Sequence, residues 1–80
     1  MFFVYVLLSL KDHKFYIGHT NDLEDRVKSH NEGRVPATRN RSPLVLVYSG
    51  SFATRSAAVQ RERYLKSLKG NKRFRELIGV

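Results

Sequence analysis

The feature that most constrains this chain is an apolar run at its start, which a short polar segment separates from a second apolar run. Phe2–Leu8 is rich in aromatic and β-branched residues and is too short to span a membrane, so it predicts a buried strand. Residues 11–14 are polar, and Phe15–Ile17 begins a second strand that Gly18 ends. Strands joined by so short a connection pair antiparallel. The chain is therefore predicted to open with a β-hairpin.

Two tyrosines occupy this predicted hairpin, Tyr5 in the first strand and Tyr16 in the second. A turn over residues 11–14 places both at the same end of the strand pair, and side chains alternate between the two faces of each strand. We expect the two phenols to converge on one surface patch. Gly18 has no Cβ, so backbone or a ligand can approach closely where the second strand ends.

A helix is predicted directly after the hairpin. Asn21 is a good N-cap, and Glu24 follows it at the spacing of a capping box. The helix runs to about Asn31, and Gly33 ends it. The face that packs inward carries Leu23, Val27 and His30. Arg26 lies at the edge of this face, where its stem packs while its guanidinium stays free to point at the tyrosines.

The remainder of the chain predicts one more strand and two more helices. Residues 43–48 form the strand, and their unbroken apolar character favours an interior place in the sheet or cover on both faces. Thr54 caps a helix that runs to about Lys69, and Asn71 caps a last short helix. The predicted architecture is α+β: a three-stranded antiparallel sheet flanked by helices in the order β-β-α-β-α-α, forming one domain over residues 1–80.

The charge balance predicts the kind of partner. Fifteen Lys and Arg residues against seven Asp and Glu residues give a formal net charge of +8, which favours polyanions and above all nucleic acid. The loop over residues 33–43 contains no acid and three arginines, Arg34, Arg39 and Arg41. We expect this loop to lie along a phosphate backbone, although each arginine taken alone is equally compatible with a solvated loop.

The compartment is predicted from two absences in the sequence. Cysteine is absent, which excludes disulfides and thiolate metal sites. The apolar start has neither the basic region nor the small-residue cleavage site of a signal peptide. We therefore expect a cytoplasmic protein that does not associate with a membrane.

Glu62 is the most informative acid. It is the only carboxylate between Glu32 and Glu76, and it interrupts the apolar stripe of its helix. A buried carboxylate is costly unless it is paired or bound to a metal, so Glu62 is a candidate metal ligand. The alternative is an ion pair with Lys66, four residues further along the helix, on a partly exposed face.

These residues together resemble the GIY-YIG nucleases. Tyr16-Ile17-Gly18 matches the second half of the family's signature. Phe3-Val4-Tyr5 stands in place of the first half and keeps its tyrosine but not its glycine. The other positions at the family's spacing are Arg26, His30 and Glu62. The resemblance covers nearly the whole chain and is strongest to small, stand-alone bacterial members.

The resemblance implies a Mg²⁺- or Mn²⁺-dependent endonuclease that hydrolyses phosphodiester bonds in DNA. Glu62 is then the metal ligand, and Arg26 contacts the scissile phosphate. Tyr5 and Tyr16 activate or position the attacking water, and His30 accepts or relays a proton. Further contacts with nucleic acid are expected from Gly18, Arg34, Arg39, Arg41 and Lys66. Asn71 falls near a position where some relatives place an asparagine in the site, and its N-cap role explains it equally well.

The expected specificity is low, because so small a domain has few elements that read bases. Branched or single-stranded DNA and a role in DNA repair or recombination agree with this expectation. The rival interpretation is a nucleic-acid-binding module with weak or no catalysis, which includes binding to RNA or the ribosome. The sequence leaves the oligomeric state open.

Overall fold

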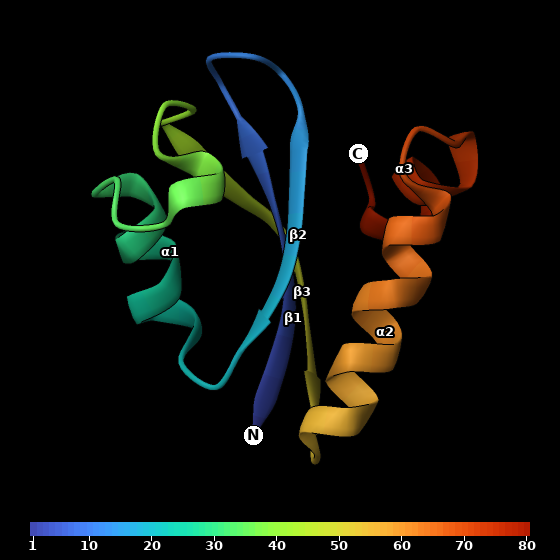
Figure 1. Ribbon diagram of the computed structural model, residues 1–80. Coiled ribbons are helices and arrows are strands. Elements are labelled where there is room, and N and C mark those ends of the chain that lie inside the picture. The colour runs from blue at the N-terminus through green and yellow to red at the C-terminus, as the bar shows by residue number, and fades with distance from the viewer.

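The computed structural model describes residues 1–80 and shows a three-stranded sheet with helices on both faces (Figure 1). The elements are, in chain order, β1 (Phe2–Ser9), β2 (Phe15–Thr20), α1 (Leu23–Asn31), the 3₁₀ helix η1 (Pro36–Thr38), β3 (Leu44–Phe52), α2 (Arg55–Leu68) and α3 (Lys72–Ile78). Both strand pairs are antiparallel, and the spatial order is β2-β1-β3. In Figure 1, α1 and η1 cover one face of the sheet, and α2 and α3 cover the other. The predicted α+β fold and the predicted order of elements are therefore confirmed.

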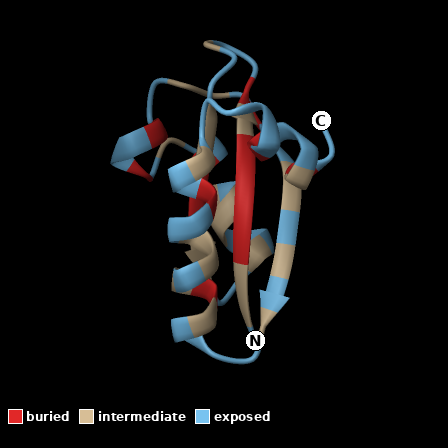
Figure 2. Cartoon of the chain, turned by 90° about the vertical axis from the view of Figure 1, so that its right-hand side faces the viewer, coloured by how far each residue is buried: buried red, intermediate tan, exposed pale blue.

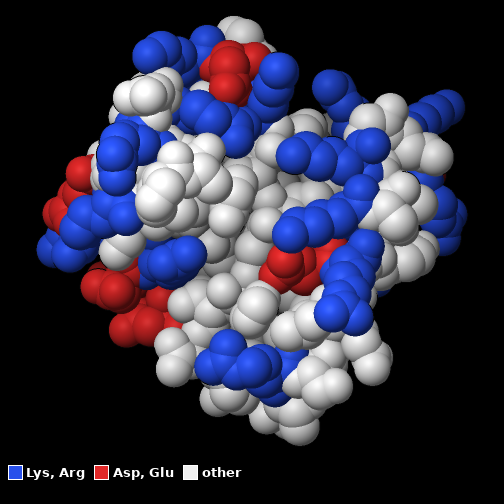
Figure 3. All heavy atoms as spheres, in the orientation of Figure 1, with Lys and Arg blue, Asp and Glu red and all other residues white.

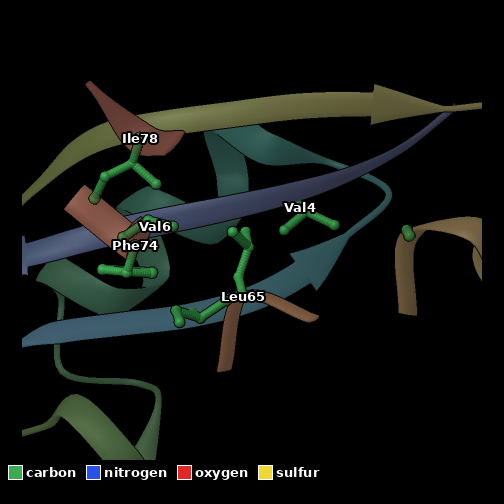
Figure 4. Close-up of a cluster of buried hydrophobic side chains, with 7 residues drawn as sticks. Val4, Val6, Leu65, Phe74 and Ile78 are labelled. Atoms are coloured by element: carbon green, nitrogen blue, oxygen red, sulfur yellow. The ribbon is translucent and has the colours of Figure 1, made fainter. Parts of the chain in front are cut away.

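The central strand is β1, and its residues supply the cores on both faces of the sheet. Its middle residues, 4–7, are buried and form the red centre of the sheet in Figure 2. On the α2 side, Val4 and Val6 pack with Leu65 and Phe74 (Figure 4). On the α1 side, a smaller cluster consists of Tyr5, Leu7 and Leu44, with Tyr16, Leu23 and Val27 against it.

The placement of β3 corrects two expectations. An interior place in the sheet or cover on both faces was expected. The strand β3 is instead an edge strand, and Val45 and Leu46 are 39% and 41% exposed. A bulge between Val6 and Leu7 of β1 accommodates an extra residue of β3 and interrupts the alternation of its side chains. The strand also continues to Phe52, because β1 offers backbone partners along its whole length whatever side chains β3 carries.

The first helix begins one residue later than expected. Asp22, not Asn21, is the N-cap, and its carboxylate accepts a hydrogen bond from the Asp25 backbone N–H at 3.1 Å. The backbone of Asp22 is extended, as an N-cap requires, and Thr20 Oγ1 accepts a hydrogen bond from its N–H. The predicted end is right, since α1 ends at Asn31 and Gly33 has a φ of +76°. The caps predicted for the other helices, Thr54 and Asn71, are confirmed.

Asn31 ties the end of α1 to the start of β3. Its Nδ2 donates to the Leu44 carbonyl at 2.9 Å, and the Leu44 N–H donates to its Oδ1 at 2.7 Å. The amide thus satisfies both backbone groups of the residue that opens the edge strand. No helix of the structure combines the length and the apolar character that crossing a bilayer requires.

We predict that Asn31→Ala lowers the free energy of unfolding by about 1–3 kcal/mol, because it leaves two partly buried backbone groups without a partner. Chemical denaturation measures this change. Asn40→Ala is the matched control, since Asn40 is an exposed asparagine and should change stability by less than about 0.5 kcal/mol. Equal effects of the two substitutions would contradict the assigned role of Asn31.

Candidate active site

The α1 face of the sheet carries a hydrogen-bonded cluster centred on Tyr5. This tyrosine is 1% exposed, and its phenol oxygen lies 2.9 Å from His30 Nε2. Arg26 Nε donates to the same oxygen at 3.4 Å. His30 Nδ1 lies 2.7 Å from the Thr38 hydroxyl of η1. Because Arg26 and His30 are four residues apart on α1, one turn of that helix brings both to the tyrosine of β1.

The imidazole of His30 is fully buried and neutral at pH 7. Burial, together with the charge of Arg26, lowers its pKa to about 4. A neutral imidazole offers one N–H donor and one acceptor nitrogen. Arg26 can only donate, so the Tyr5 oxygen accepts from it and the Tyr5 hydroxyl hydrogen points to His30 Nε2. Because Nε2 is then the acceptor nitrogen of the neutral ring, His30 Nδ1 carries the hydrogen and donates to Thr38. This assignment, made from the network, satisfies every group in it.

The two tyrosines share a face of the sheet but differ in exposure. Tyr5 pairs with Gly18 and Tyr16 pairs with Leu7, so the two are diagonal neighbours whose ring centroids lie 6.4 Å apart. The Tyr16 ring also lies 4.9 Å from that of His30. Tyr16 is partly exposed, whereas Tyr5 is buried. Both phenols were expected to converge on one surface patch. They do lie on the same face of the sheet, but Tyr5 is buried, so the two do not form a surface patch.

Gly18 explains why Tyr5 is buried. A Cβ at this position would lie 2.6 Å from the Tyr5 phenol oxygen, so only glycine leaves room for the ring. The close approach expected at Gly18 is therefore made by a side chain of the protein itself. Burial also raises the pKa of Tyr5 above its ordinary value near 10, and the hydrogen bond from Arg26 offsets only part of this effect.

Glu62 lies on the opposite side of β2, where the α2 face of the sheet begins. Its Oε1 lies 2.5 Å from His19 Nδ1, its Oε2 lies 2.7 Å from Lys66 Nζ, and its side chain is 14% exposed. Burial by itself raises the pKa of this carboxyl, but hydrogen bonds from Lys66 and His19 outweigh it and hold the pKa below its usual range. The alternative interpretation of Glu62, an ion pair with Lys66, is thus present in the structure.

The edge strand β2 separates Glu62 from the Tyr5 cluster. Gly18 and His19 are consecutive, so their side-chain positions lie on opposite faces, one against Tyr5 and the other against Glu62. Figure 1 shows β2 in front, between α1 and α2. In the same view, Figure 3 shows basic side chains on both sides of a largely uncharged strip, with acidic atoms enclosed by basic ones over α2. Groups from both faces therefore flank one unpaired strand edge.

The donor set around Glu62 fits a hard divalent cation better than zinc. No group of three or more His, Cys, Asp and Glu side chains is placed to hold a metal ion, which is what a structural or catalytic zinc site requires. Magnesium needs only one or two carboxylates, because waters and substrate phosphates complete its shell. Glu62 supplies one carboxylate at the border of a basic surface, which meets that lower requirement.

Of the basic residues expected to bind nucleic acid, one has no acidic partner and three form ion pairs. Arg39 is exposed, and Arg34 is exposed but lies 2.6 Å from Glu32. Lys66 pairs with Glu62, as described above. Arg41 is partly buried, and its Nε donates to Asp12 at 2.7 Å, which fastens the loop over residues 33–43 to the β1–β2 turn. Of the three loop arginines, Arg41 therefore has a structural task.

Asn71 lies apart from the tyrosines. Its side chain accepts from the Arg73 N–H at 2.9 Å as the N-cap of α3, and it borders a cavity beside the β1–β2 turn. Its cap role is thus the one that the structure shows.

Two residues of the site were not anticipated. His19 was missed because the second strand was predicted to end at Gly18, whereas β2 continues to Thr20 and its alternation puts His19 on the face opposite to that of Tyr16. Thr38 carries no local signal, because its contact with His30 depends on how the loop over residues 33–43 folds back.

The fold thus places a tyrosine, arginine and histidine cluster beside a strand edge and a carboxylate across that edge. Comparison with known proteins shows the class of this domain. The GIY-YIG catalytic domain matches residues 1–75. The chain therefore belongs to the GIY-YIG family, a family of nucleases that generally use a divalent metal.

Similar proteins of comparable size are known from bacteria and archaea. The chain is 43% identical over 72 residues to the UPF0213 protein YazA of Bacillus subtilis, covering 89% of this chain and 72% of that protein. It is 43% identical over 74 residues to a UPF0213 protein of Natronomonas pharaonis, covering 91% and 86%. The solution NMR structure of a UPF0213 protein from Bacillus halodurans superposes with a TM-score of 0.56 at 34% identity, covering 98% of this chain and 82% of that one.

We predict that the buried His30 makes the protein less stable as the pH falls. Its pKa is about 4 when folded and 6.5 ordinarily, so the unfolded chain takes up the proton first. The stabilisation is complete above about pH 6.5 and is lost toward pH 4, by about 2–3 kcal/mol. Denaturation curves between pH 4 and pH 7 measure it.

The comparison variant is His30→Gln, which keeps polar atoms but cannot titrate, so its stability should fall less steeply over the same range. Parallel curves for wild type and His30→Gln would show that His30 does not titrate as assigned.

Proposed function

We propose that the protein is a Mg²⁺- or Mn²⁺-dependent endonuclease that hydrolyses phosphodiester bonds in DNA with little sequence specificity. One observation carries this proposal. The Tyr5 cluster and Glu62 flank the same unpaired edge of β2, from opposite faces, on a chain with a formal net charge of +8. A phosphate backbone lying along this edge would meet an arginine, a phenol and a carboxylate at once.

Arg26 is the candidate contact for the scissile phosphate. Its Nε is engaged by Tyr5, so the direction of the guanidinium is set while its two terminal nitrogens stay available. A fixed positive charge with a planar pair of donors suits a non-bridging phosphate oxygen. Because that oxygen gains negative charge in the transition state, a preorganised arginine lowers the barrier.

The two tyrosines take different tasks under this proposal. Tyr5 is buried and its pKa is raised, so we assign it the positioning of Arg26 and His30. Tyr16 is partly exposed beside His30, so we assign it the contact with the attacking water or with the phosphate. His30, whose pKa is lowered to about 4, is a poor proton acceptor at neutral pH, so we assign it the positioning of the Tyr5 phenol through their hydrogen bond.

Glu62 would hold the divalent cation. When bound, such a cation polarises the phosphoryl oxygen and stabilises the leaving oxygen. His19 donates to one oxygen of the carboxylate and so orients it. Lys66 pairs with Glu62 and has a side chain that is 52% exposed, so its ammonium would be within reach of a phosphate placed beside that carboxylate.

A second function is favoured by the engagement of Glu62. Both of its oxygens already contact cationic or N–H groups, an arrangement that is complete without metal. A module that binds DNA or RNA without cleaving it would retain the contacts of Glu62 with His19 and Lys66. Cleavage assays on plasmid, branched and single-stranded DNA, with Mg²⁺, Mn²⁺ or EDTA, separate the two functions. Binding without cleavage in every condition would favour the module.

We predict that Glu62→Gln lowers the rate of DNA cleavage by about 100-fold or more, because a neutral amide is a poor ligand for Mg²⁺. DNA affinity should stay equal or rise slightly, since a negative charge near phosphate is removed. Glu76→Gln on α3 is the control, because it removes the same charge at an exposed position. Wild-type cleavage by Glu62→Gln, with unchanged Mg²⁺ dependence, would make the metal assignment wrong.

We predict that Tyr16→Phe and Tyr5→Phe separate catalysis from structure. Tyr16→Phe should lower cleavage at least tenfold while changing the free energy of unfolding by less than about 0.5 kcal/mol. Tyr5→Phe should also destabilise the protein by about 1–3 kcal/mol, because buried His30 and Arg26 lose their shared partner. Tyr64→Phe, at an exposed position of α2, is the control for both readouts. Full cleavage by Tyr16→Phe would remove that phenol from the reaction.

A further inference from the structure

A cavity of about 540 Å³ lies away from the Tyr5 cluster, between the β1–β2 turn and the start of α3. No acidic side chain lines it, whereas six titratable basic residues do: His13, Lys14, Arg41, Lys69, Lys72 and Arg75. In Figure 3, basic side chains gather over the corresponding end of the molecule, around α3. Its volume lies within the range of pockets that hold small ligands. This concentration of positive charge in a concave surface predicts an anionic ligand.

The charge in this cavity is incompletely neutralised by the protein. Asp12 pairs with Arg41 Nε at 2.7 Å, but Arg41 Nη2 is buried and has no hydrogen-bond partner. A buried donor without a partner costs about 1–3 kcal/mol. Lys69 shows the same imbalance, since burial and the nearby charges of Arg41, Lys66 and Lys14 lower its pKa. An anion in the cavity would relieve this repulsion.

Two aromatic residues form the apolar part of the wall. The rings of Phe15 and Phe74 meet edge to face with centroids 5.2 Å apart, and the Arg75 guanidinium lies 5.9 Å from the centre of the Phe15 ring. The cavity therefore combines cations with an aromatic surface. A phosphate group attached to a larger organic body fits this combination better than a simple inorganic anion.

We propose that this cavity is a second phosphate-binding site, separate from the Tyr5 cluster, and that it holds a backbone phosphate on one flank of the nucleic acid. The phosphate chemistry stands by itself, whereas the nucleic-acid source rests on the proposed function. Phe15 and His19 are four residues apart on β2, a separation of about 14 Å. This corresponds to about four base steps of one strand, so one nucleic acid would reach both sites.

The experiment uses two double variants with equal charge. Lys14→Gln with Lys72→Gln alters the cavity, and Lys11→Gln with Lys28→Gln removes two exposed lysines elsewhere. Each lowers the formal net charge from +8 to +6, which is 8 minus 2. The first probe is inorganic pyrophosphate. Its binding is measured from changes in the amide chemical shifts of the protein by NMR, in the absence of divalent metal. The second is a twelve-base-pair duplex, whose affinity is measured against salt by fluorescence anisotropy.

We expect pyrophosphate to shift the amides of Lys14 and residues 69–75, and to bind the cavity variant at least fivefold more weakly than wild type. The control variant should stay within twofold. For the duplex, the slope of log affinity against log salt should become shallower by about one in the cavity variant, since the one phosphate contact that is lost contributes about 0.9. The slope for the control should stay close to that of the wild type.

Shifts confined to Tyr16 and Arg26, or equal losses in the two variants, would overturn the proposal. Pyrophosphate binding in the cavity with unchanged duplex slopes would support the phosphate site and overturn its assignment to nucleic acid, leaving a free nucleotide or a small phosphate compound as its ligand. Neither measurement involves cleavage, so failure of the proposed endonuclease activity would leave these outcomes readable.

Discussion

The hydrogen bond between the Tyr5 phenol and His30 is the interaction on which the α1 side of the structure depends. Both groups are buried, so each must find a partner inside the protein, and a missing partner would cost about 1–3 kcal/mol. This requirement sets the register of α1 against β1. The same requirement explains the position of η1, because the second ring nitrogen of His30 is hydrogen-bonded by Thr38 of that helix. The same phenol oxygen accepts a hydrogen bond from Arg26 Nε, and this bond fixes the direction of the Arg26 guanidinium.

The second organising constraint is that β2 is an edge strand. Its outer backbone is not paired with another strand, and its consecutive residues Gly18 and His19 serve opposite faces. A site that drew on one face alone would have either the phenols or the carboxylate. An edge strand offers both to one ligand, provided that the ligand approaches from the side. An extended polyanion does so more readily than a small molecule, which agrees with the positive charge on both flanks.

The few acids of the chain are used to arrange its cations. Asp12 holds Arg41 and Glu62 holds Lys66, while Glu32 pairs with Arg34 at the surface. With fifteen Lys and Arg residues and seven acids, most basic side chains have no acidic partner. Their distribution is uneven, and the cavity beside α3 collects six basic residues without any acid. Positive charge therefore has a structural function at one end of the loop over residues 33–43 and remains available for a ligand elsewhere.

The sequence by itself determined the order of the strands and α-helices and the caps at Thr54 and Asn71, because strand alternation, helical spacing and capping are local rules. The grouping of Tyr5, Arg26 and His30 in one site followed from the resemblance to the GIY-YIG nucleases, and the structure brings the three together. It did not determine the edge position of β3 or the start of α1 at Asp22, since the first depends on which strand pairs with β1 and the second on two adjacent candidates for one cap. Only the tertiary structure decided that Tyr5 is buried over Gly18 while Tyr16 stays partly exposed, and that Glu62 contacts His19. Those outcomes depend on the space that distant residues leave for one another, which no local pattern encodes.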